Sequence, residues 1–219
     1  MTTQTTAAAE NNDFLVTLLT KTVRFYKKHQ TRVLVTLVIL ILAVTAGVVY
    51  TNHQQKITEN SWAAYYQAQL ALWQQGQEAG FKQLDQVTAD FKGTPAADYA
   101  QLLKGDVLYS AENFAQAANV YKEVTSSKNN TVSTLAQLSQ AAALQASQNY
   151  NQAAKLMQAF ILQNPKSFAL PQAYLTLALS EELAGHKAEA VEAYKYLLEN
   201  HTKTYFGKVA KDKLSELQK

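Results

Sequence analysis

The stretch PQAYLTLALSEELAGHKAEAVEAYKYLLENHTKT, residues 171–204, decides the fold class of this 219-residue chain. It contains two runs of helix-forming residues, rich in Ala, Leu, Glu and Lys, on either side of Gly185. Small residues stand at Ala178, before the glycine, and at Ala190, after it. Because small side chains at facing positions let two helices approach closely, this stretch predicts a helical hairpin.

The same pattern recurs upstream. Ala153 precedes Ala190 by 37 residues and follows Ala117 by 36, and a small residue stands ahead of each at Gly105 and Ala141. Such hairpins cannot bury their apolar faces alone, so they stack on one another. The sequence therefore predicts an all-α solenoid of about four hairpins, the first of them a degenerate copy with Ala68, Gly80, Leu84 and Val87.

The remaining composition fits this interpretation. Seven Gly and three Pro are few breakers for a sandwich or barrel, and the absence of Cys excludes disulfides, thiolate metal sites and cysteine nucleophiles. Residues 203–219 are expected to form a helix that caps the solenoid and is polar outside, with its apolar face made by Phe206, Val209, Ala210, Leu214 and Leu217.

A second feature lies ahead of the repeats. Residues 33–50 read VLVTLVILILAVTAGVVY, eighteen residues without a charge. As a helix this run is about 27 Å long, close to the roughly 30 Å hydrocarbon core of a bilayer. We therefore expect a transmembrane helix over 33–50, continued by a polar, helical linker over 51–60 and followed by the repeat domain over 61–219. The alternatives are a buried core helix and a signal peptide cleaved near Val44-Thr45-Ala46.

The charges predict the orientation of this span. Residues 1–32 carry five basic and two acidic side chains, whereas residues 51–219 carry fifteen of each and have no excess for binding nucleic acid. The positive-inside rule places residues 1–32 in the cytoplasm and the repeats on the other side. Ahead of the span, the sequence predicts a helix with a basic stripe on one side and an apolar stripe on the other, which is typical of a helix lying in the headgroup layer. The apolar stripe consists of Phe14, Leu15, Leu18, Leu19, Thr22 and Phe25.

No constellation typical of catalysis occurs. The four histidines, His29, His53, His186 and His201, share no metal-binding spacing, and the glycines form no phosphate loop. The pairs Glu181-Glu182 and Glu189/Glu192 are expected on solvated helix faces. We therefore predict a protein that is not an enzyme and that binds no cofactor, metal or small-molecule substrate.

Residues 61–202 resemble the tetratricopeptide repeat, a 34-residue helix-turn-helix unit. The resemblance is clearest over 171–204, whereas Gln101 and Gln137 replace its usual aromatic residue. It implies a concave, protein-binding groove. Because the Lys/Asn clamp for carboxylates is absent, an apolar peptide is the expected ligand, unless the aromatics pack against the linker or the capping helix. The residues expected in the groove are Trp62, Tyr65, Gln69, Leu72, Trp73, Tyr99, Leu102, Asp106, Tyr109, Leu175 and Leu179.

The order of tail, span, linker and repeats resembles the YfgM-like family of Gram-negative bacteria. That resemblance implies an ancillary subunit of the SecYEG translocon, anchored in the inner membrane with a periplasmic repeat domain. Its implied partners are the translocon and a membrane-anchored, prolyl isomerase-like chaperone. The alternative functions are a scaffold in another envelope complex and an enzyme. The alternative topology is the inverted one, with the repeats in the cytoplasm.

Overall fold

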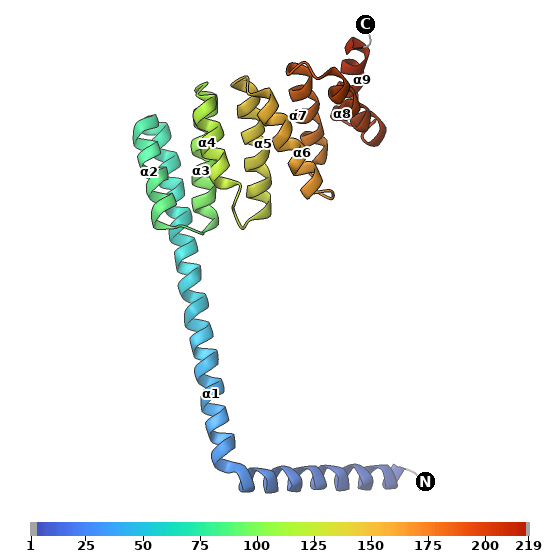
Figure 1. The fold of residues 1–219 in the computed structure, drawn as a ribbon. Coiled ribbons are helices and arrows are strands. Elements are labelled where there is room, and N and C mark those ends of the chain that lie inside the picture. Colours follow the sequence, from blue (N-terminus) through green and yellow to red (C-terminus); the bar gives the residue numbers. More distant parts are fainter. Residues whose placement is uncertain (1–3, 218–219) are drawn as a thin grey trace. The chain divides into compact units, whose positions relative to one another are not determined.

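The computed structural model describes the backbone of residues 4–217 and the side chains of residues 16–217. Phe14 and Leu15 of the predicted apolar stripe thus lie outside the described side chains. Within the described part the chain is all-helical, as predicted (Figure 1). The helices are α1 (Gln4–Gln74), α2 (Gln77–Asp90), α3 (Pro95–Ser110), α4 (Phe114–Val124), α5 (Asn130–Ala146), α6 (Tyr150–Gln163), α7 (Leu170–Leu183), α8 (Lys187–Asn200) and α9 (Tyr205–Leu217).

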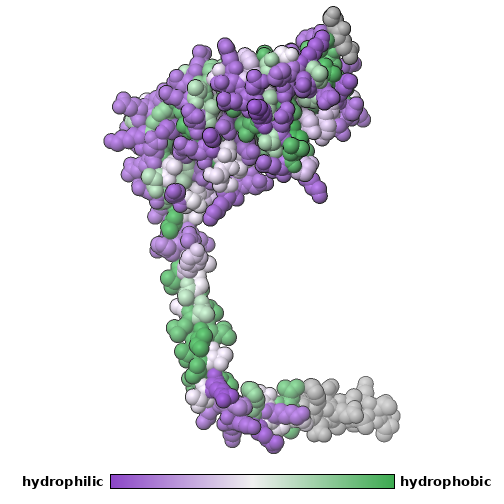
Figure 2. All heavy atoms as spheres, in the orientation of Figure 1, coloured by the Kyte–Doolittle hydropathy of each residue, from purple (hydrophilic) through white to green (hydrophobic). Residues whose placement is uncertain are grey.

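The chain divides into two units, Met1–Lys56 and Ile57–Lys219. In the first unit, His29 interrupts the helical conformation of α1, with φ −126° and ψ 24°. Beyond this break lies the apolar run, whose side chains are exposed and form a continuous apolar surface on the face shown (Figure 2). It is not a buried core helix, and its length and composition make it a candidate membrane anchor or signal sequence.

Two hydroxyl groups inside this apolar run are satisfied by the helix itself. Thr36 Oγ1 donates to the carbonyl oxygen of Arg32 over 2.9 Å, and Thr45 Oγ1 donates to that of Ile41 over 2.8 Å. Polar groups inside a bilayer need such internal partners because lipid supplies none. The two Thr residues are therefore compatible with a membrane span. Residues 51–60, expected as a linker, are helical and belong to α1.

The second unit is a stack of hairpins (Figure 1). The end of α1 pairs with α2, and the pairs α3/α4, α5/α6 and α7/α8 follow, with α9 last. The repeated small residues lie at the helix contacts, where Ala117, Ala153 and Ala190 are fully buried. At Gly105 a Cβ atom would lie 2.5 Å from Cε1 of Tyr121 on α4. The pattern of small residues therefore sets how closely the two helices of each hairpin pack.

A polar contact joins the third hairpin to the fourth. Gln145 Nε2 of α5 donates to the carbonyl oxygen of Thr176 over 2.9 Å and to Ser180 Oγ over 2.7 Å, both on α7. The Ser180 hydroxyl donates in turn to the Thr176 carbonyl, and both of these residues are buried. Buried polar groups need partners, so this contact fixes one relative position of α5 and α7.

Each of the last three hairpins turns in the same way. A residue with positive φ follows the first helix: Glu112 (60°), Gln148 (62°) and Gly185 (85°). The next amide then donates to a carbonyl five residues earlier, as in His186 N to Glu181 O over 2.9 Å. This is a C-terminal helix cap that favours glycine, because a side chain strains the left-handed conformation. Only the last of the three positions has one.

Substituting glycine at the middle turn should therefore stabilise the domain. We expect Gln148→Gly to raise the free energy of unfolding by about 1 kcal/mol, because it removes the side-chain strain of the left-handed conformation. Gly185→Ala is the matched reverse change and should lower it by a similar amount. Guanidinium unfolding of the full chain, followed by circular dichroism, measures both. A destabilised Gln148→Gly variant would contradict this account of the turn.

Candidate functional site

The N-terminal end of the predicted groove is filled by its own aromatic residues. The Trp62 ring lies 5.6 Å from the Tyr65 ring on the same helix and 5.6 Å from the Tyr99 ring on α3, between ring centroids. Tyr65 is buried, and its hydroxyl accepts a hydrogen bond from Gln69 Nε2 over 3.1 Å. Burial raises the pKa of Tyr65. These aromatics pack on one another between the first two hairpins, rather than on the linker or on α9.

Four leucines of the predicted groove contribute to the core. Leu102 and Leu175 are buried, and Leu72 and Leu179 are half-buried against the same clusters. Their side chains stabilise the stacking of the hairpins and offer little surface to a ligand. The accessible part of the predicted set is therefore smaller and consists of Trp73, Asp106 and Tyr109.

Three of the accessible apolar residues share a position in their hairpins. Trp73, Tyr109 and Leu183 lie at the C-terminal ends of α1, α3 and α7, each the first helix of its hairpin. Their exposed fractions are 91%, 37% and 55%. Trp73 borders a cavity of about 390 Å³ that Leu103 and Val107 of α3 also line. Exposed aromatic and large apolar side chains beside a cavity are typical of protein-binding surfaces.

Asp106 adds a polar group to this surface. Its Oδ1 accepts a hydrogen bond of 2.6 Å from the Tyr121 hydroxyl, and the residue remains exposed on its other side. Partial burial raises the pKa of the Asp106 carboxyl, while the hydrogen bond from Tyr121 acts in the opposite direction. A carboxylate in this setting can accept a hydrogen bond from a bound backbone amide or side chain.

The capping helix covers the other end of the predicted groove. Lys213 Nζ of α9 lies 3.0 Å from Glu182 Oε1 of α7, and the Tyr194 hydroxyl of α8 donates to Glu182 Oε2 over 2.7 Å. Burial, and then the hydrogen bond to this carboxylate, raise the pKa of Tyr194. The accessible surface is thus limited by the aromatic cluster on one side and by α9 on the other.

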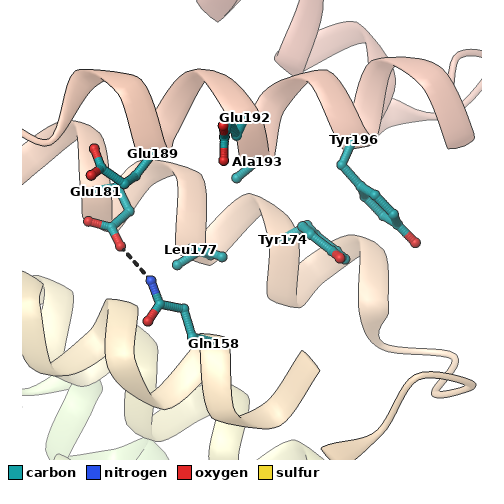
Figure 3. Close-up of a pocket in the computed structure, with 8 residues that line it drawn as sticks. All are labelled: Gln158, Tyr174, Leu177, Glu181, Glu189, Glu192, Ala193 and Tyr196. Atoms are coloured by element: carbon teal, nitrogen blue, oxygen red, sulfur yellow. Dashed lines mark hydrogen bonds between the residues drawn. The ribbon is translucent and has the colours of Figure 1, made fainter. Parts of the chain in front are cut away.

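An acidic pocket that the sequence did not suggest lies between α6, α7 and α8 (Figure 3). Its volume is about 340 Å³. The expectation that Glu181 is solvated is wrong: it is buried, with Gln158 Nε2 2.9 Å from Oε1 and His186 Nδ1 2.7 Å from Oε2. The turn at Gly185 brings His186 back over α7 and explains this burial. Glu189, Glu192 and the stacked Tyr174 and Tyr196 rings complete the pocket.

Among the residues that the structure describes, no group of His, Asp or Glu side chains could hold a metal ion. Trp73, Tyr109 and Leu183, which we call the exposed row, and the acidic pocket offer binding surfaces rather than a nucleophile with its base. Their arrangement can bind a polypeptide through apolar contact and hydrogen bonds.

Comparison with known proteins supports the same conclusion. The sequence matches the tetratricopeptide repeat-like domain family over residues 23–219. A putative kinesin light chain with tetratricopeptide-like repeats from Podosopora anserina has a similar fold, with a TM-score of 0.55 and 15% identity over 73% of this chain and 86% of that one. MamA from Desulfovibrio magneticus RS-1, residues 41 to the end, gives a TM-score of 0.50 and 16% identity over 72% and 93%.

The search of curated proteins gives no match. The two structural likenesses show the fold alone. The matched family is typically a non-catalytic scaffold for protein–protein interaction and indicates no enzyme. Because the match covers the repeats and most of the sequence ahead of them, the chain belongs to the tetratricopeptide repeat-like domain family.

Proposed function

We propose that this protein is a non-catalytic adaptor, anchored in the inner membrane by residues 33–50, with its N-terminus in the cytoplasm and its repeat domain in the periplasm. The apolar run supports the anchor because it is exposed along its length and has its hydroxyl groups satisfied internally. The five basic residues ahead of it support the orientation. A protease-protection assay on spheroplasts tests this topology directly.

The working surface of the adaptor is the exposed row of Trp73, Tyr109 and Leu183. This row carries the proposal, because it places large apolar groups on three hairpins of a family of interaction scaffolds. Its ligand is an apolar, extended or helical segment of another polypeptide. Such a segment is what a newly translocated, unfolded chain exposes.

The partners follow from the resemblance to the YfgM-like family. They are the SecYEG translocon, contacted through the span and the helix ahead of it, and a membrane-anchored periplasmic chaperone. The function is then to hold translocated chains near the channel exit and assist their transfer to folding factors. The competing function is a scaffold in another secretion, division or assembly complex of the envelope, which would use the same exposed row.

Photocrosslinking in cells separates these functions. A photoreactive residue at Val38 should crosslink to translocon subunits, and one at Tyr109 or Leu183 to chaperones or nascent chains. Phe168 is the matched control, because it is 71% exposed but lies in the connection between α6 and α7. Crosslinks from Val38 to a different envelope complex would overturn the translocon role. Equal yields at Phe168 and at the row would overturn the assignment of the surface.

A further inference from the structure

A second exposed apolar stripe lies at the N-terminal end of the solenoid. Tyr66 and Leu70 face outward from the last part of α1, with 62% and 54% of their surface exposed. With Ala63 they follow one another at spacings of three and four residues. That spacing places the three side chains on one side of a helix and matches the heptad pattern of paired helices.

The repeat register shows what this stripe does in the other hairpins. Ala68 aligns with Gly105, so Tyr66 and Leu70 correspond to Leu103 and Val107 of α3. Leu103 packs on the first hairpin, in the cluster of Ala68 and Leu84. In α7 the corresponding residues, Thr176 and Ser180, are buried and meet α5. These positions are therefore the ones through which a hairpin contacts the hairpin before it.

The two ends of the solenoid differ in whether the contact face of the terminal hairpin is covered. At the C-terminal end, α9 covers the last hairpin and presents polar residues such as Lys208 and Lys211 to solvent. At the N-terminal end, no described residue covers Tyr66 and Leu70. A terminal repeat normally needs a polar outer face for solubility, so an apolar one indicates a surface that is covered by a partner.

The residues around the stripe favour a copy of the same chain as that partner. Between residues 57 and 77 the only charged side chain is Glu59, and the stripe is flanked by Gln67, Gln69 and Gln74. A charged partner could form few ion pairs with this surface. Two identical stripes, in contrast, can meet with little repulsion between like charges. Two copies held in one membrane with the same orientation are related by an axis normal to it. Equivalent residues then face each other.

We infer that the stripe Ala63, Tyr66 and Leu70 pairs two copies of this protein, with Leu70 of one copy against Leu70 of the other and Trp73 left to the exposed row. The contact is small: roughly 300 Å² per copy, from the usual size of such side chains, against about 800 Å² in a standard interface. The pairing therefore depends on the raised effective concentration of anchored chains. It rests on the membrane anchoring proposed above but on none of the proposed partners.

The absence of cysteine makes this pairing directly testable. Two differently tagged full-length copies, each carrying Leu70→Cys, are expressed together and their membranes are oxidised mildly. We expect a disulfide-linked homodimer that contains both tags. Ala89→Cys, at an exposed position on α2 of the same hairpin, should stay monomeric. Equal linkage at both positions, or linkage of Leu70→Cys to another polypeptide alone, would overturn the inference.

A second pair of variants separates pairing from folding. In an Ala63→Cys background, Leu70→Glu should abolish the linked homodimer, because it places two carboxylates in the contact. Phe168→Glu, an equally simple change at an exposed site, should leave the homodimer intact. A homodimer that survives Leu70→Glu would show that the stripe is not the contact. Photocrosslinks at Tyr109 report the proposed function independently, so either proposal can fail while the other stands.

Discussion

Replacing Tyr194 with alanine is expected to lower the free energy of unfolding of the repeat domain by about 3–5 kcal/mol. The Tyr194 ring is fully buried in the cluster formed by the last two hairpins and α9. Its hydroxyl also donates to Glu182, which Lys213 of the capping helix contacts from the other side. Alanine therefore leaves a cavity and removes one of the two partners of that carboxylate.

Tyr194→Phe is the matched control, because it keeps the ring and removes the hydroxyl alone. We expect it to cost about 1 kcal/mol, since Glu182 retains Lys213. Guanidinium unfolding of the full chain in detergent, followed by circular dichroism, measures both variants. If the alanine variant were no less stable than the phenylalanine variant, the ring would not be the main contribution of Tyr194.

Replacing Gly207 with valine is the second change with a large expected effect. A Cβ atom at this position would lie 2.3 Å from the carbonyl oxygen of His201 and 2.8 Å from Cα of Thr202. Both are backbone atoms, so no side-chain rotation can relieve the clash, and the turn between α8 and α9 must open. Overpacking of this kind typically costs about 1–3 kcal/mol, and the fixed backbone places Gly207→Val at or above the upper end.

The expected loss is localised, and hydrogen exchange can locate it. Amide protection should fall first in α9, which loses its position on α7, and the contact between Lys213 and Glu182 should be lost with it. Lys208→Val is the matched control, because Lys208 is the exposed neighbour on the same turn and its replacement should change stability by about 0.5 kcal/mol at most. Unchanged protection of α9 in Gly207→Val would contradict the close approach.

The fold could be predicted because its determinants are local in the sequence. The small residues at Ala117, Ala153 and Ala190 repeat at a fixed period, and all three lie where two helices meet. The apolar face of residues 203–219 likewise has the helical period, and α9 packs through it. Such contacts can be predicted from the size and periodicity of the residues alone, because they do not depend on the curvature of the stack.

The site could be predicted only in part because it depends on that curvature. Which side of α3 or α7 remains open is decided by how neighbouring hairpins stack, so Leu102 and Leu175 become core residues while Tyr109 and Leu183 stay exposed. The burial of Glu181 depends on a turn that returns His186 to α7, which no spacing shows. The stripe of Tyr66 and Leu70 did carry a sequence signal, the heptad spacing.

The contact of Gln145 with Thr176 and Ser180 bears on how the chain sorts its own hairpins during folding. The hairpins resemble one another closely enough that apolar packing alone would tolerate a hairpin docking on the wrong neighbour, or on a neighbour from another copy. A wrong neighbour would leave the Gln145 amide without its partners on α7, at a cost of about 1–3 kcal/mol. The Gln145 side chain therefore makes the pairing of the third and fourth hairpins specific, which the repeated alanines alone cannot do.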